Sequence, residues 1–85
     1  MTTQNSKIIF DIECDGLKPT KLHCIVAKEV GGEVHEFTPD RLAEGIEFLS
    51  NADTLIGHNI LRFDLDVINK LTGVDLYHKN IEDTL

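Results

Sequence analysis

Residues 7–13 read Lys-Ile-Ile-Phe-Asp-Ile-Glu, and this stretch decides the fold. Three isoleucines and a phenylalanine in so short a run favour a strand that is buried on both faces. Asp11 and Glu13 stand two apart at its end, so in a strand their side chains leave the same face as Ile9 and can reach one point in space. We predict the central strand of a sheet here.

The segments that follow predict further strands alternating with helices. A hairpin is expected around Gly31-Gly32, and Thr38-Pro39-Asp40 is typical of a helix start, with a hydroxyl that can cap and proline at the first position. The expected elements are strands at 22–28 and 33–38, a helix from 38 to 51, a strand at 54–57, a helix from 63 to 71 ending at Gly73, and a short strand within 77–82. This order indicates a single α/β domain spanning residues 1–85, with a mixed sheet and helices packed on it.

Composition narrows the class of protein. The chain has 85 residues and a formal net charge of −7. It lacks any run near the ~18 apolar residues that a membrane span needs, and its polar N-terminus has no secretion signal, so we expect a cytoplasmic location and no membrane partner. The acidic charge disfavours a protein that binds nucleic acid unaided, unless divalent cations or a basic partner supply positive charge. It also leaves open an acidic protein that mimics DNA and inhibits a DNA-binding enzyme.

The two acids of the first strand suggest a metal site. Acidic side chains on an apolar central strand require a cation to offset their repulsion, and carboxylate oxygens suit Mg²⁺ or Mn²⁺. The alternative is that the strand ends at Asp11 and that both acids are solvated loop residues. Cys14 and Cys24 show no zinc-binding spacing and are expected to be partly buried.

A third acid lies in the second predicted helix. On a 3.6-residue period Asp64 falls on the core-facing stripe, whereas Asp66 falls on the solvent side. The other members of that stripe are Leu61, Val67, Ile68 and Leu71. Asp64 is then either a partner of the helix dipole or a ligand directed at the acids of the central strand.

The remaining polar residues allow simpler interpretations. Asn59 can cap the helix, or together with His58 it can position the backbone of a substrate, and His58 can also act as a general base. Asp83 is most simply the cap of a further helix. The other histidines are expected at or near the surface: His23, His35 and His78.

Two stretches resemble known motifs. Phe10-Asp11-Ile12-Glu13 resembles the first exonuclease motif of the DnaQ-like, or DEDD, superfamily of 3′→5′ exonucleases, and Gly57-His58-Asn59 with Phe63-Asp64 resembles the second. The stretches 21–24 and 81–85 are similar to parts of the proofreading domains of phage family A DNA polymerases. The resemblance covers nearly the whole chain.

The resemblance implies a ribonuclease H-like fold, truncated after the second exonuclease motif. It also implies two divalent ions, Mg²⁺ or Mn²⁺, held by Asp11, Glu13 and Asp64, which hydrolyse the terminal phosphodiester of a single-stranded DNA 3′ end. Glu13 would also orient the attacking water. The path of the 3′ end would be lined by Asn59 and Phe63, with His58 alongside, and Leu17 would wedge against the terminal base.

Members of this superfamily carry a third motif, with a tyrosine or histidine and a final aspartate, which this sequence does not contain. We therefore expect a partial exonuclease domain that acts with a C-terminal segment or a polymerase as its partner. Apolar surface is expected at 67–71 and around Leu76, which favours a homodimer. A non-catalytic module that docks to a replication protein is the alternative.

Overall fold

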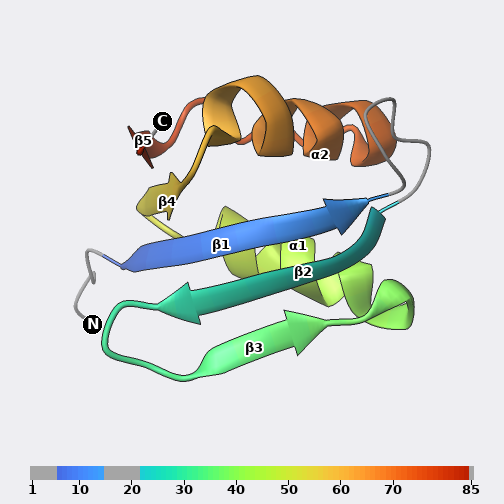
Figure 1. The fold of residues 1–85 in the computed structure, drawn as a ribbon, viewed down its shortest axis with the longest axis horizontal. Helices are drawn as coiled ribbons and strands as arrows, with labels where there is room; N and C mark the ends of the chain where they lie inside the picture. Colours follow the sequence, from blue (N-terminus) through green and yellow to red (C-terminus); the bar gives the residue numbers. More distant parts are fainter. Residues whose placement is uncertain (1–5, 15–21, 85) are drawn as a thin grey trace.

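The computed structural model describes residues 6–14 and 22–84, which form a five-stranded sheet with helices packed against it (Figure 1). The strands lie in the order β3-β2-β1-β4-β5, and β1 is the central one, as predicted. Both β2 and β3 run antiparallel to their neighbours, whereas β4 and β5 are parallel to β1. The strand bounds are β1 (Lys7–Cys14), β2 (Leu22–Glu29), β3 (Val34–Phe37), β4 (Thr54–Gly57) and β5 (Asn80–Asp83).

Strand β1 is buried on one face only, so the prediction of a strand buried on both faces is wrong. Its core-facing side chains are Ile8, Phe10 and Ile12, each at most 5% exposed. Ile9 is 45% exposed, and Asp11 and Glu13 are exposed on the same face. In Figure 1 helix α1 lies behind the sheet. The exposed side chains of β1 alternate with the buried ones and so form its other, open face.

The predicted hairpin is confirmed. Strands β2 and β3 pair from Ile25↔Phe37 to Lys28↔Val34. Gly31 has a φ of 86°, a left-handed conformation that suits glycine, and the Gly32 N–H donates to the Glu29 carbonyl at 2.7 Å. The hairpin places β2 beside the whole length of β1.

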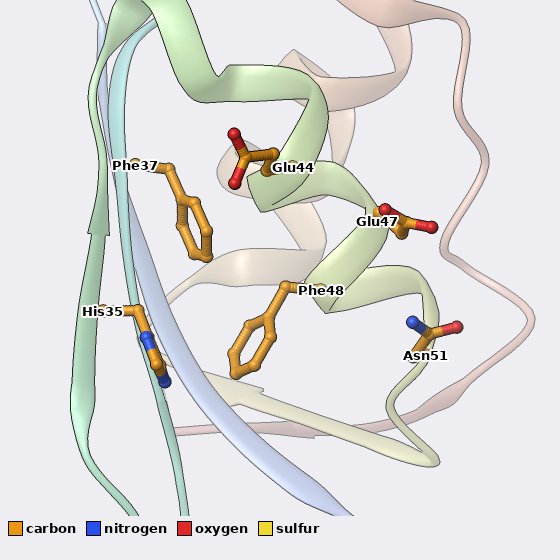
Figure 2. A pocket seen from close by; sticks show the side chains of 6 residues that line it. All are labelled: His35, Phe37, Glu44, Glu47, Phe48 and Asn51. Atoms are coloured by element: carbon orange, nitrogen blue, oxygen red, sulfur yellow. The ribbon is translucent and has the colours of Figure 1, made fainter.

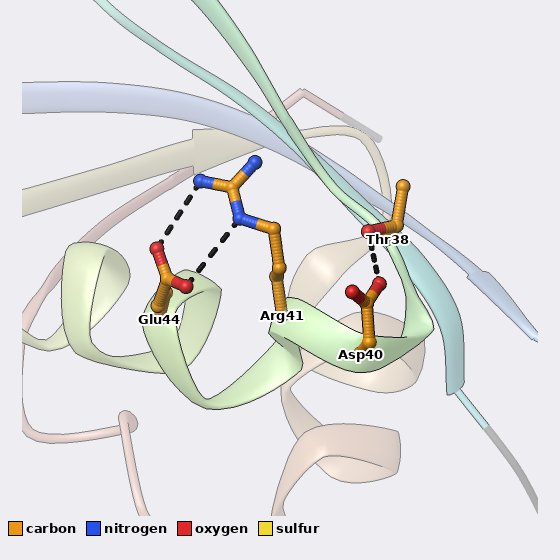
Figure 3. A network of polar contacts seen from close by, with 4 residues as sticks. All are labelled: Thr38, Asp40, Arg41 and Glu44. Carbon is orange, nitrogen blue, oxygen red and sulfur yellow. Dashed lines mark hydrogen bonds and ion pairs between the residues drawn. The ribbon is translucent and has the colours of Figure 1, made fainter.

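The first helix begins as the sequence predicts, but its cap differs. A 3-10 turn, Pro39–Arg41, leads into α1 (Leu42–Ser50). The Thr38 hydroxyl donates to the Asp40 carboxylate at 2.6 Å and makes no capping hydrogen bond to the helix backbone, while Arg41 pairs with Glu44 at 3.1 Å (Figure 3). The first turn is thus stabilised by side-chain pairs on the surface.

Helix α1 packs close to the sheet at a glycine. A Cβ atom placed on Gly45 would lie 2.9 Å from Phe37 Cγ, so this residue permits the approach. Phe37 also belongs to a group of three packed rings. The ring centroids of His35 and Phe48 lie 5.0 Å apart, and those of Phe37 and Phe48 lie 5.7 Å apart. Figure 2 shows the three rings between β3 and α1, beside a cavity of about 330 Å³.

The second helix completes one continuous core. A π-helical turn, Ile60–Asp64, leads into α2 (Leu65–Thr72), which ends at Gly73 with a φ of 79°, as predicted. Val67, Ile68 and Leu76 are at most 4% exposed and belong to the same cluster as the buried residues of β1. The expectation of an apolar surface at these residues is therefore wrong, because they are already buried in the core that the described residues form.

Candidate metal and substrate site

The site lies where β1 extends beyond β4. The two strands pair only over Lys7–Ile9 and Thr54–Ile56, and β4 ends at Gly57. A Cβ on Gly57 would lie 3.0 Å from the Phe10 carbonyl oxygen and would overlap Ile60 Cγ2, so only glycine lets the chain leave β4 this close to β1. The second half of β1 therefore keeps its edge free for a side chain of the following helix.

Asp64 takes up that edge. Its Oδ2 accepts a hydrogen bond from the Ile12 N–H at 3.2 Å, and the residue is 4% exposed, which confirms that Asp64 faces the core. The pKa of its carboxyl is raised from 3.8 to about 6. Burial is the largest cause, the Asp11 carboxylate acts in the same direction, and the hydrogen bond from the Ile12 N–H acts in the opposite direction. Among the ion pairs formed by the described residues, none includes Asp64. Within the described part of the chain, this carboxylate is therefore buried in the core without a basic partner.

Asp11 and Glu13 lie on the open face of β1. Asp11 is close enough to influence the pKa of Asp64, whereas Glu13 lies next to the irregularity in the β1–β2 pairing at Glu13/Cys14. Within residues 6–14 and 22–84, no three acidic, histidine or cysteine side chains stand close enough together to hold a metal ion. The structure thus brings Asp11 and Asp64 into electrostatic contact and leaves Glu13 outside a ready-made cluster.

The turn between β4 and α2 differs from the sequence prediction. Asn59 is left-handed, with φ of 58°, and makes no side-chain cap, so its expected capping role is wrong. Its Oδ1 is buried and has no hydrogen-bond partner among the residues that the structure describes. Leu61, expected on the core stripe, is 44% exposed, because the π turn adds a residue and shifts the phase of the helix.

The other predicted substrate contacts lie around this turn, apart from one. Phe63 is half-buried and packs against the core, and His58 is exposed with Nδ1 3.4 Å from the Thr84 hydroxyl. A cavity of about 480 Å³ runs along the open face, and its wall includes Ile9, Asp11 and His58. Leu17 lies outside the described residues.

Asp83 makes contacts that sequence reasoning missed. Its Oδ1 accepts from the Asn59 N–H at 2.7 Å, and its Oδ2 accepts from the Leu61 N–H at 3.0 Å. It therefore caps the turn before α2 from the end of β5. The only sequence signal was an acidic residue at the end of a weak strand, and the partners 22 and 24 residues away could not be read from it.

The cysteines lie beside Glu13: Cys14 follows it in β1, and Cys24 pairs with it from β2. Cys14 and Cys24 are half-buried, as predicted. Burial, and after it the Glu36 carboxylate, raises the pKa of the Cys24 thiol. His23 and His78 are exposed, as expected. No helix in the described part of the chain is long and apolar enough to cross a membrane.

Comparison with known proteins gives a structural match. No protein-family model matches the chain, and no curated protein sequence matches it. Among solved structures, the family B DNA polymerase from the hyperthermophilic archaeon Pyrobaculum calidifontis matches with a TM-score of 0.66 and 21% identity, over 85% of this chain. The chain has a ribonuclease H-like fold. This fold class, predicted from the sequence, is thereby confirmed.

The ribonuclease H-like match covers 12% of the polymerase chain, so it concerns one small region of that protein. The matched polymerase belongs to family B, whereas the sequence motifs resemble those of phage family A. The assignment to family A therefore stays a prediction. At this level of identity the match establishes the fold alone.

Proposed function

We propose that this chain is part of the 3′→5′ exonuclease domain of a DNA polymerase and acts on the terminal phosphodiester of a DNA 3′ end. The observation that carries the proposal is the position of Asp64, whose buried carboxylate reaches the edge of β1 beside Asp11. The resemblance of 10–13 and 57–64 to two exonuclease motifs, and a fold shared with part of a polymerase, support it. Neither feature depends on the other.

The residues of this corner fit a hard divalent cation. Asp64 is a buried carboxylate whose pKa is raised by burial and by Asp11, and neither carboxylate forms an ion pair with a described basic residue. Such a pair of acids is stabilised by a bound cation that replaces the missing positive charge. We assign Asp11 and Asp64 as ligands of Mg²⁺ or Mn²⁺. Glu13 lies on the same face of β1 as Asp11, and its side chain would have to move toward them to become a third ligand. Bound ions of this kind supply charge that offsets the negative charge developing on the reacting phosphate.

The protein's own groups would position the DNA. The cavity along Ile9 and His58 offers an apolar wall and a polar wall next to Asp11, which suits a nucleoside beside its phosphate. The buried Oδ1 of Asn59 accepts no hydrogen bond from the described residues and could accept one from the DNA. Phe63, which directly precedes Asp64 in the sequence, supplies an aromatic ring. Stacking on an aromatic ring tolerates any base, as removal of a terminal nucleotide requires.

A metal titration tests the proposal. Mn²⁺ added to the 85-residue chain, followed by calorimetry and by paramagnetic broadening of amide signals, should broaden the signals around Ile12 and Asp64. Asp64→Asn and Asp11→Asn should each weaken binding by about tenfold or more, since each removes one charged ligand. Asp66→Asn is the matched control, because Asp66 lies two residues along the same region and pairs with Lys70 at 3.0 Å. Equal binding by all three variants would exclude this site.

A second candidate is a non-catalytic module that keeps the fold and docks to a replication protein. The position of Glu13, outside any three-ligand cluster of described residues, favours it. The two candidates differ in an assay of single-stranded DNA digestion by the chain supplemented with a segment carrying the third exonuclease motif. Mn²⁺-dependent shortening from the 3′ end supports the exonuclease, and intact DNA supports the docking module.

A further inference from the structure

The turn between β4 and α2 is held by residues from a distant part of the chain. A helix start leaves backbone N–H groups without partners inside the helix, and a nearby side chain normally accepts from them. Here the local candidate, Asn59, makes no such cap, and both oxygens of Asp83 accept from the Asn59 and Leu61 N–H groups. A single carboxylate thus satisfies two groups at the start of the turn.

Thr84, the next residue along the chain, also makes hydrogen bonds to this turn. The Thr84 N–H donates to the Gly57 carbonyl at 2.9 Å, and the Thr84 hydroxyl lies 3.3 Å from that oxygen. Gly57 and Asp83 are direct partners in the β4–β5 register, so the two strand ends are in step at this point. Residues 57–61 are therefore tied to the end of β5 by backbone and side-chain hydrogen bonds.

This turn determines the position of Asp64. The π turn runs from Ile60 to Asp64, and the Phe63 N–H donates to the Asn59 carbonyl at 3.1 Å, so the backbone between Asn59 and Asp64 is one continuous hydrogen-bonded unit. A shift at Asn59 would therefore carry over to Asp64. The distance from Asp64 Oδ2 to the Ile12 N–H is the first contact that such a shift would change.

We propose that Asp83 is a positioning residue of the site, which fixes the turn at 59–61 and thereby holds the Asp64 carboxylate against β1. Both of its carboxylate oxygens accept from backbone N–H groups of the turn, so we assign it no role as a metal ligand, and it acts through Asn59, Leu61 and the π turn. The inference rests on the proposed function for its importance to metal binding. The mechanical link between Asp83 and Asp64 is independent of that function.

The test uses Asp83→Asn and Asp83→Ala in the full 85-residue chain, read by amide hydrogen exchange and chemical shift. Asp83→Asn keeps the shape of the side chain but loses its charge and one acceptor oxygen. We expect exchange at Asn59 and Leu61 to accelerate about tenfold or more, as for loss of a hydrogen bond to a charged group. The Ile12 amide should shift and exchange faster in the same variant, and Mn²⁺ affinity should fall by about tenfold or more.

Asp75→Asn is the matched control. Asp75 is an exposed aspartate that accepts one local hydrogen bond, from the Tyr77 N–H at 2.9 Å, and it should leave all of these readouts unchanged. If Asp83→Ala does not fold, Asp83→Asn decides the question. Faster exchange spread evenly over the core amides, Leu49 and Leu55 included, would show only general loss of stability and would overturn the proposal.

The outcomes also separate this inference from the proposed function. If Asn59 and Leu61 respond while the Ile12 amide stays at its wild-type position, Asp83 is a cap with no hold on Asp64, and the positioning role is overturned. If the wild-type chain binds no Mn²⁺, the exonuclease proposal fails. In that case a response of the Ile12 amide in Asp83→Asn still supports the positioning role, and its absence still overturns it.

Discussion

Replacement of Asp64 by asparagine should remove a loss of folding stability that the metal-free protein undergoes as the pH rises. The pKa of Asp64 is raised from 3.8 to about 6, so between these values the folded protein holds a proton that the unfolded chain has released. Stability from this group is fully present below the unfolded pKa and is lost as pH rises through the folded pKa. A rise of about two in pKa corresponds to ~3 kcal/mol. That is a large share of the ~4–13 kcal/mol expected for a domain of this size.

Urea unfolding with a chelator present, at about pH 4.5 and about pH 7.5, measures this effect. At the higher pH the Asp64→Asn variant should be more stable than the wild type by up to ~3 kcal/mol, less the cost of placing an amide NH₂ group in the core. At the lower pH the advantage should shrink or change sign. Asp66→Asn, on the exposed side and paired with Lys70, should show no such crossover. A difference between Asp64→Asn and wild type that is the same at both pH values would refute the electrostatic reasoning.

Three further outcomes follow from the structure. Mn²⁺ at about 100 times its dissociation constant should stabilise the wild type by about 2.7 kcal/mol in thermal or urea unfolding, and the same Mn²⁺ concentration should stabilise Asp64→Asn by about 1.4 kcal/mol or less, because binding is at least tenfold weaker. Gly45→Ala should destabilise by about 1–3 kcal/mol in urea, because its Cβ would lie 2.9 Å from Phe37 Cγ; a gain in stability would show that the helix can move away from the sheet. Lys79→Met should cost about 1–3 kcal/mol, because Lys79 Nζ donates to the Ser50 and Ala52 carbonyls at 2.7 Å each; an unchanged urea midpoint would mean that water replaces both bonds.

Local patterns in the sequence were sufficient to predict most of the fold. The apolar run at 7–12, the Gly31-Gly32 turn and the Gly73 stop each act through neighbouring residues, and each was confirmed. The burial of Asp64 followed from helical periodicity alone. These features depend on backbone preferences that a short window of sequence contains.

The features that sequence could not supply depend on contacts across the fold. The π turn shifts Leu61 outward. Asn59 is left-handed and makes no cap, and Asp83, which is 24 residues away, caps the turn in its place. The openness of one face of β1 was missed because an apolar run reads the same whether one face or both are covered. The exposure expected at Leu76 was wrong because the described elements already bury it.

Lys79 and Asp83 together fix the register of strand β5. Strand β5 is four residues long, none of them fully buried, so its own side chains specify its alignment weakly. Lys79 binds carbonyls at the end of α1, and Asp83 binds amides at the start of the turn into α2. The C-terminal end of a helix attracts a positive charge and the N-terminal end a negative one, so each side chain has the favourable charge. A slip of β5 by one residue would break both anchors together, so two charged side chains give this short strand an alignment that its apolar content does not.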